Sequence, residues 1–178
     1  MSSRKPSITR SYIREIVFGF EDSLVSTVGA LTGIAVGAGD KGVVILAGLV
    51  LIVVEATSMA GGSILSNKAV GDSARTENAT PSFDERHPIF GGLVMGVSYI
   101  LAGLVPLVPY LFLPLTTAPV WSIGFTLAVL FGIGTWLTRF THRPVLRSGF
   151  EVLVIGGVAI CLGYLVGRFV SGVFGMGL

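Results

Sequence analysis

Five acidic residues fall within or beside long apolar segments, where a charged side chain is costly. They are Glu15, Glu21, Asp22, Glu55 and Glu151. A carboxylate in a bilayer core costs at least ~2.5 kcal/mol, and such groups usually line the path of an ion or a proton. These acids are therefore the first candidates for a functional site.

The first apolar segment places two acids and a hydroxyl on one helical face. With a rotation of about 100° per residue, Glu15, Asp22 and Ser26 fall on a single stripe, which Gly29 continues. Glu21 points away from this stripe, and it either pairs with another helix or faces the same cavity. We expect Ser26 and Glu21 to contribute to a proton or ion pathway.

The second apolar segment carries Glu55 and Met59 on one face. At a rise of 1.5 Å per residue, Asp22 lies about 12 Å beyond Arg14, and Met59 lies about 14 Å before Lys68. Asp22 and Met59 are therefore expected at similar depth on antiparallel helices, with Glu55 one turn deeper.

Carboxylate oxygens beside a thioether indicate a particular class of metal ion. Mg²⁺ and Ca²⁺ bind oxygen ligands, whereas thioether sulfur favours softer transition metals. We therefore predict that Asp22, Glu55, Met59 and Glu15 bind Fe²⁺ or Mn²⁺. A carboxylate in a low-dielectric environment also binds protons more readily, so that protons and metal compete for it. Two alternatives stay open: Met59 packs only, and Glu55 is a protonated acid that bonds across helices.

Other polar groups allow two interpretations each. Glu15 and Glu151 lie near Arg14 and Arg147, where they either belong to the pathway or form interfacial ion pairs. Further along the chain, a metal-capture site or a solvated loop is formed by Asp84, Glu85 and His87. The single cysteine, Cys161, is expected to pack. No pairing of nucleophile and base and no cofactor loop is apparent, so we expect neither an enzyme nor a bound cofactor.

These side chains must be positioned by membrane helices. The 178 residues are 52% hydrophobic and 12% charged, with a mean hydropathy of +0.83. This composition excludes a water-soluble globule and a disulfide-stabilised module, and the continuously apolar runs exclude an outer-membrane barrel. We predict one all-α membrane domain with five spans, near residues 16–36, 43–65, 89–112, 121–137 and 150–169.

Basic residues predict the orientation of these spans. Ten of the twelve flank the spans on one side, and only Lys41 and Arg168 fall on the other. The positive-inside rule therefore places the N-terminus and the loop 69–88 in the cytoplasm and the C-terminus outside.

The net charge of +2 does not indicate a nucleic-acid partner. The sequence has no targeting extension, so we expect a prokaryotic plasma membrane, or a vacuolar-type membrane if the protein is eukaryotic.

Glycine spacing indicates close helix packing. Small residues recur every fourth position at Gly29, Gly33 and Gly37, with further pairs at Gly92/Gly96 and Gly163/Gly167. They either pack helices within one chain or pair the first helices of two copies. Five spans cannot divide into equal halves, so a homodimer is the expected source of twofold symmetry.

Several segments together resemble the vacuolar iron transporter (CCC1-like) family. They are REIVFGFEDSLVST (14–27), SMAGG (58–62), GLVPLVPY (103–110), LRSGFE (146–151) and GYLVGR (163–168). Their order and spacing cover residues 14–168. The resemblance implies a five-helix homodimer that exports Fe²⁺, and often Mn²⁺, from the cytosol in exchange for protons, with the path at the dimer interface.

The resemblance also assigns residues and shows two differences. Asp22 and Met59 match the metal-pathway Asp and Met of the family, and Glu15 matches an acid nearer the cytoplasm. A further acid found eight residues before the Met in plant and fungal members is Leu51 here, and we expect Glu55 to substitute for it. The long metal-binding insertion of many members is absent between the second and third spans, so the chain is similar to the short form. The alternatives to an exporter are a membrane metal sensor or scaffold, and a transporter of protons or organic cations.

Overall fold

The computed structural model describes residues 8–76, 83–141 and 145–174, and these residues are almost entirely helical. Five helices are long: α1 (Ile8–Ala38), α2 (Lys41–Thr76), α4 (Pro88–Phe112), α5 (Ala118–Thr141) and α6 (Val145–Phe174). A single turn, α3 (Phe83–Arg86), lies between α2 and α4. The prediction of an all-α fold is confirmed for this part of the chain.

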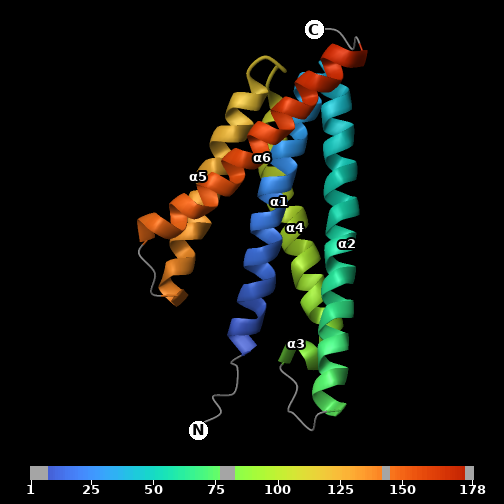
Figure 1. Cartoon of the computed structure of the whole chain (residues 1–178), viewed down its shortest axis with the longest axis vertical. Coiled ribbons are helices and arrows are strands. Elements are labelled where there is room, and N and C mark those ends of the chain that lie inside the picture. The colour runs from blue at the N-terminus through green and yellow to red at the C-terminus, as the bar shows by residue number, and fades with distance from the viewer. Residues whose placement is uncertain (1–7, 77–82, 142–144, 175–178) are drawn as a thin grey trace.

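Helix α1 is the central element of the bundle. It contacts α2, α4, α5 and α6, while α2 packs along α4 and α5 packs along α6 (Figure 1). Successive long helices run in opposite directions, so α1 begins at the end where α3 lies, here called the α3 end. The turn that joins α4 to α5 marks the opposite end, here called the α4–α5 end.

Four of the described helices are long and apolar enough to cross a membrane: α2, α4, residues 118–136 of α5 and residues 149–173 of α6. Helix α1 is more polar, but it packs against four other long helices, and several of its polar side chains are buried there. These are Glu15, Ser23, Thr27 and Thr32. Because protein rather than lipid covers this face, the sequence of α1 need not be uniformly apolar. The chain is therefore a helical membrane protein.

Two connections differ from the sequence prediction. Helix α2 continues for eleven residues beyond the expected end of the second span at Leu65, and its 36 residues are about 54 Å long. Most of the described part of the expected loop 69–88 is therefore helical, in α2 and α3. A hydropathy pattern detects only the apolar part of a helix, so the predicted span ends where polar residues begin. The helix itself can continue through polar residues, because they do not prevent helical hydrogen bonding as proline does.

The proline-containing segment of α4 also stays helical. Proline inside a helix ordinarily kinks or ends it, yet α4 continues past Pro106 and Pro109 to Phe112, and the Leu113 N–H donates to the Pro109 carbonyl at 2.9 Å. The Ser122 hydroxyl of α5 donates to the Pro106 carbonyl at 2.7 Å. This contact ties α5 to the proline-containing part of α4.

The glycine contacts lie within one chain. A Cβ atom at Gly33 of α1 would come within 2.6 Å of the Gly163 carbonyl oxygen of α6, and one at Gly29 within 2.9 Å of the Ala159 carbonyl oxygen. On α4, a Cβ at Gly92 would lie 2.6 Å from the Ala60 carbonyl oxygen of α2. Of the two interpretations of the glycine pattern, the structure therefore supports close packing within the chain.

These contacts predict that Gly163→Ala destabilises the bundle by roughly 1–3 kcal/mol, because the added methyl group overlaps the Gly29 carbonyl group. Gly157→Ala, on the same helix, is the matched control, because its Cβ has no neighbour within 4 Å. The control is expected to be neutral or slightly stabilising through helix propensity. Thermal unfolding in detergent measures both, and equal melting temperatures would contradict the packing described here.

Candidate functional site

A pocket of about 310 Å³ between α1 and α2, here called the central pocket, collects most of the predicted metal ligands. It is lined by Asp22 and Ser26 of α1 and by Glu55, Ser58 and Met59 of α2. Asp22 and Glu55 are close enough for their negative charges to repel each other. The structure thus brings together Asp22, Glu55 and Met59, as predicted from helical spacing and from the depth estimated by the rise per residue.

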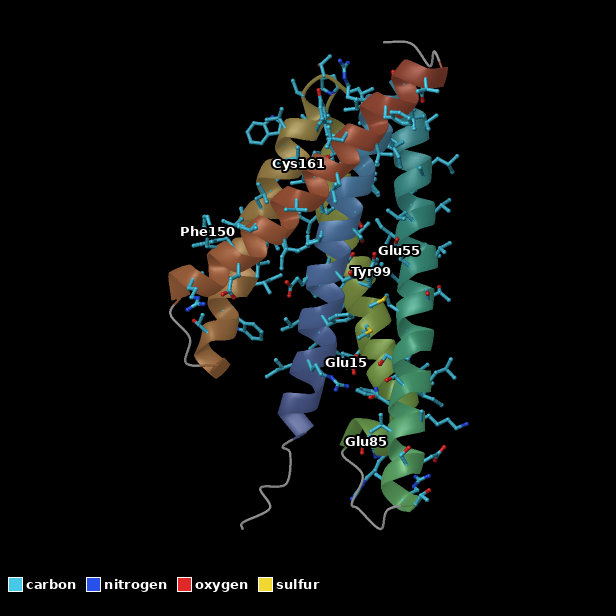
Figure 2. The ribbon with its side chains drawn as sticks, viewed as in Figure 1. Glu15, Glu55, Glu85, Tyr99, Phe150 and Cys161 are labelled. Atoms are coloured by element: carbon cyan, nitrogen blue, oxygen red, sulfur yellow. The ribbon has the colours of Figure 1, made fainter. Side chains whose placement is uncertain are left out.

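Glu55 is held by two hydroxyl groups from other helices. Ser26 Oγ of α1 donates to Glu55 Oε2 at 3.0 Å, and Tyr99 Oη of α4 donates to the same oxygen. The two hydroxyl oxygens are 2.6 Å apart. Figure 2 shows Glu55 and Tyr99 side by side in the middle of the bundle. Three helices therefore meet at this carboxylate.

Tyr99 is a residue of the site that the sequence analysis missed. It is fully buried in α4, and Ser23 of α1 donates to its carbonyl oxygen at 2.6 Å. A buried tyrosine needs a partner for its hydroxyl, so a tyrosine inside an apolar span was the available signal. Which group it meets depends on how α4 is rotated against α1 and α2.

A second hollow, the Glu15 groove, adjoins the central pocket on the side of the α3 end. It measures about 530 Å³ and is lined by Arg14, Glu15, Phe18, Ser58, Met59, Gly62, Ser63, Ser66, Asn67 and Met95. Ser58 and Met59 line both the groove and the central pocket, so the two spaces adjoin each other. Met95 of α4 adds a second thioether to the groove, which the sequence analysis did not foresee.

Glu15 is buried in this groove and fully hydrogen-bonded. It is 1% exposed, and it accepts hydrogen bonds from Arg14 Nη2 at 2.9 Å, Ser63 Oγ at 3.1 Å and Asn67 Nδ2 at 3.4 Å. The pairing with Arg14 was one of the two interpretations left open. Glu15 therefore belongs both to an ion pair and to the wall of the Glu15 groove.

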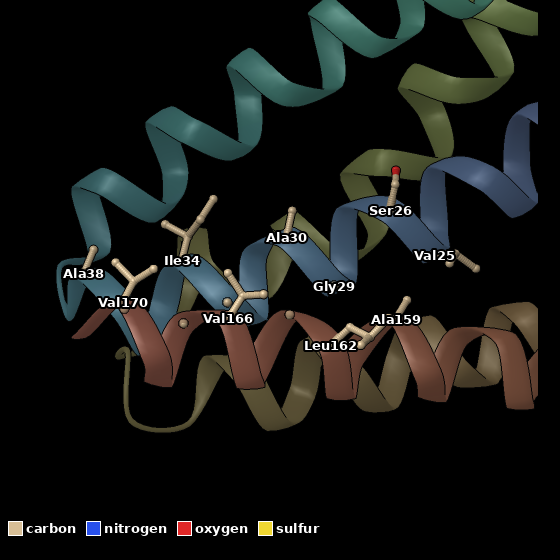
Figure 3. Close-up of a pocket in the computed structure, with 14 residues that line it drawn as sticks. Val25, Ser26, Gly29, Ala30, Ile34, Ala38, Ala159, Leu162, Val166 and Val170 are labelled. Carbon is tan, nitrogen blue, oxygen red and sulfur yellow. The ribbon is translucent and has the colours of Figure 1, made fainter. Parts of the chain in front are cut away.

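A third hollow runs along α1 on the side of the α4–α5 end. This α1–α6 groove of about 560 Å³ is almost entirely apolar, and it contains the glycine contacts between the two helices (Figure 3). Ser26 lines both this groove and the central pocket. The three spaces therefore follow one another along α1, from Glu15 to Gly37.

Two of the predicted pathway acids lie outside these spaces. Glu151 is on the exposed surface of α6, where Arg147 Nε donates to it at 3.3 Å from one turn away. It does not line the central pocket. Helix α6 packs on α1 through Ala159, Gly163 and Gly167, which lie at least two turns farther along α6 than Glu151. Glu21 is half-buried beside Asp22, but it is not among the residues that line the central pocket.

The loop residues remain a prediction. The side chain of Asp84 lies outside the described part of the structure. The backbone of Glu85 packs against Gly71 of α2, and His87 is exposed at the start of α4. Among the described residues, no group of three or more His, Cys, Asp or Glu side chains is arranged to hold a metal ion. The central pocket instead combines two carboxylates with a thioether and hydroxyl groups.

The fold and the site define a helical membrane protein with a pocket of acidic and thioether side chains inside its bundle. A model of the VIT family matches residues 13–82 and 73–168, and the chain therefore belongs to this family. The matches include transporters by name, and this classification agrees with the expectation that the protein is not an enzyme.

Individual relatives match different parts of the chain. An uncharacterised protein of Methanocaldococcus jannaschii is 27% identical over 163 residues, which cover 84% of both chains. Vacuolar iron transporter 1 of Oryza sativa subsp. japonica is 36% identical over 89 residues, or 49% of this chain and 35% of the relative. Protein CCC1 of Saccharomyces cerevisiae is 35% identical over 83 residues, or 42% of this chain and 26% of the relative. The matches to the named transporters thus cover about a third of those proteins or less.

The buried hydrogen bonds of Glu15 predict a larger structural contribution than that of the exposed Glu151. Glu15→Ala removes the shared acceptor of three donors and is expected to destabilise the bundle by about 1–3 kcal/mol. Glu151→Ala breaks an exposed pair and is expected to cost less than about 0.5 kcal/mol. Unfolding in detergent compares the two variants, and a larger loss for Glu151→Ala would contradict this assignment.

Proposed function

We propose that the protein exports a divalent transition metal from the cytosol, Fe²⁺ first and Mn²⁺ second, in exchange for protons. The observation that carries the proposal is the central pocket, where Asp22 and Glu55 face the thioether of Met59 inside the bundle. Hard oxygen and soft sulfur together favour later divalent metals over Mg²⁺ and Ca²⁺. The match to vacuolar iron transporters supports iron as the substrate.

Charge balance gives a physical basis for the exchange. Two carboxylates that repel each other in a pocket between helices are neutralised equally by one divalent ion or by two protons. Binding of metal therefore releases protons, and protonation from the other side releases metal. The pocket remains neutral in both states, which avoids the cost of an uncompensated charge in the membrane.

The order of the three spaces supports a path along α1. Metal enters by the Glu15 groove, binds in the central pocket, and leaves past Ser26 toward the α4–α5 end. Lys41 donates to the Leu111 carbonyl, and Arg168 lines a hollow with Leu115, so both of these basic residues lie at the α4–α5 end. The positive-inside rule then puts the α3 end in the cytoplasm, with α1 as the fifth span.

The outer part of this path needs a second wall. The α1–α6 groove is apolar on the side contributed by one chain, and Ala30 and Ile34 of α1 are only partly covered there. A second copy seated on this face of α1 completes the enclosure and brings two central pockets near one axis. We place the homodimer in a prokaryotic plasma membrane, in keeping with the relative from an archaeon that matches most of the chain.

Flux through proteoliposomes tests the transport function. Uptake of Fe²⁺, Mn²⁺, Co²⁺ and Zn²⁺ is measured with and without a pH gradient, and metal flux driven by protons is expected for Fe²⁺ and Mn²⁺. Asp22→Asn, which keeps the shape of the side chain, is expected to lower this flux more than about tenfold, whereas Asp72→Asn on the exposed end of α2 leaves it unchanged. Unchanged flux in Asp22→Asn would refute the assignment of the pocket.

The thioether is tested separately through selectivity. Met59→Leu preserves volume and apolarity but removes the sulfur ligand, so folding is expected to be nearly unaffected. The ratio of Fe²⁺ flux to Mn²⁺ flux is expected to fall, because Mn²⁺ depends less on soft ligands. A ratio equal to that of the wild type would show that Met59 only packs.

Cysteine crosslinking tests the proposed dimer. In a Cys161→Ser background, Ala30→Cys on the open face of α1 is expected to form a disulfide between two copies in membranes. Leu93→Cys on the exposed face of α4 is the control and is expected to stay monomeric. Crosslinking of the control alone would place the interface on another face.

A further inference from the structure

Met95 of α4 has no role in the proposed function, although it lines the Glu15 groove. Its side chain is buried, with 7% exposure, and Met59 of α2 lines the same groove. Two of the four methionines in the sequence, from different helices, therefore border one space. Neither side chain fills this space, because about 530 Å³ stays open beside them.

Close packing of the backbone fixes where these two side chains begin. A Cβ atom at Gly19 of α1 would lie 2.8 Å from the Met95 carbonyl oxygen, so α1 and α4 touch at this residue. A Cβ atom at Gly96 would lie 3.1 Å from the Cβ of Ala60 on α2. Met95 and Met59 are the chain neighbours of Gly96 and Ala60. Their side chains therefore start beside a close contact between α2 and α4 and border the same groove.

The charges that line the groove cancel each other. Among the described residues of its wall, only Arg14 and Glu15 carry a charge, and Arg14 Nη2 donates to Glu15 Oε1 at 2.9 Å. Ser63 and Asn67 donate to the same carboxylate. The protein itself therefore compensates Glu15, and the described wall of the groove, unlike that of the central pocket, has no further carboxylate to hold a divalent ion.

We infer that the Glu15 groove is a second metal site, which binds a soft monovalent cation of the Cu⁺ class through Met59 and Met95. Thioether sulfur favours soft metal ions, and it is uncharged. The cost of placing an ion in a neutral space between helices rises with the square of its charge, so a monovalent ion is favoured there over a divalent one. The hydroxyls of Ser58 and Ser66, which also line the groove, are available as additional ligands.

The two spaces thus differ in the ion that they suit. The central pocket combines two acids with one thioether, whereas the groove combines two thioethers with no net charge. Under the proposed function, a divalent metal passes through the groove but is held in the central pocket. Met59 lines both spaces, whereas Met95 lines the groove and not the central pocket, so replacement of Met95 distinguishes the two sites. Binding of a monovalent ion in the groove does not require transport and is tested independently of it.

Titration of the detergent-solubilised protein with Ag⁺, a soft monovalent ion that resists oxidation in water, tests this site. The exposed thiol of Cys161 would also bind Ag⁺, so Cys161→Ser is the parent protein. Calorimetry is expected to show a single tightly bound Ag⁺ per chain. Met95→Leu preserves volume and apolarity but removes a sulfur ligand, so the Kd for Ag⁺ is expected to rise about tenfold or more.

A comparison of single and double variants shows whether the two thioethers hold the same ion. If they do, Met59→Leu and Met95→Leu each weaken the tight site without changing its stoichiometry, and the double variant lacks it. Ag⁺ binding that is unaffected by these replacements would overturn the inference. Two tight Ag⁺ ions in the parent, each lost with one methionine, would also overturn it. If Met95→Leu does not fold, Met59→Leu gives the same readout, because Met59 is less buried.

Leu107→Met is the matched control. It adds a thioether to α4 within the buried cluster of Leu31 and Tyr110, outside the groove. The number of tightly bound Ag⁺ ions and their Kd are expected to equal those of the parent. A second tight Ag⁺ in this variant would overturn the inference, because any buried thioether would then be sufficient.

Mn²⁺ binding distinguishes the groove from the central pocket. Asp22→Asn is expected to lower the affinity for Mn²⁺ far more than that for Ag⁺, and Met95→Leu is expected to do the reverse. A loss of Ag⁺ affinity that is greater in Asp22→Asn than in Met95→Leu would overturn the inference, because it would place the soft ion in the central pocket. Absence of Fe²⁺ and Mn²⁺ binding in the parent, with Ag⁺ binding intact, would instead refute the proposed function alone.

Discussion

The close contact between the glycine face of α1 and α6 determines where the polar groups of this protein lie. Backbone approaches backbone at Gly29 and Gly33, so α6 covers α1 without any intervening side chain. Together with α2, α4 and α5, it shields a helix that is too polar to face lipid on all sides. The acids of α1 can therefore sit inside a bundle, where their partners are chosen by protein side chains rather than by water.

The acids inside the bundle differ in whether a positively charged side chain compensates them. Glu15 has a counter-charge in Arg14 and two further donors from α2, so its charge is compensated by the fold itself. Asp22 and Glu55 face each other in a pocket where the donors to Glu55 are neutral hydroxyls. A compensated acid stabilises the structure, whereas two uncompensated acids create a demand for positive charge. In the proposed mechanism, this difference separates a structural carboxylate from a metal-binding one.

Helical periodicity was sufficient to predict part of the site but not all of it. Asp22, Glu55 and Met59 could be grouped because the rise and rotation of a helix are fixed, and basic residues mark where the spans begin. Tyr99 and Met95 could not be placed, because their contacts depend on how α4 is rotated against its neighbours. The same limitation applies to the glycines, whose spacing indicates a close neighbour but does not identify α6. The length of α2 was underestimated because hydropathy marks the apolar part of a helix and not its end.

The contrast between the three spaces along α1 bears on how a metal ion would leave. The Glu15 groove and the central pocket offer carboxylates, hydroxyls and thioethers, whereas the α1–α6 groove beyond Ser26 offers almost only carbon. A divalent ion that leaves polar ligands for an apolar groove loses coordination, and the groove of one chain cannot replace it. In the proposed exchange, protonation of Asp22 and Glu55 would lower the affinity of the site for metal, but it would supply no ligands farther out. The outward step therefore requires water or a second set of polar groups, and a twofold partner on the open face of α1 would provide space for both.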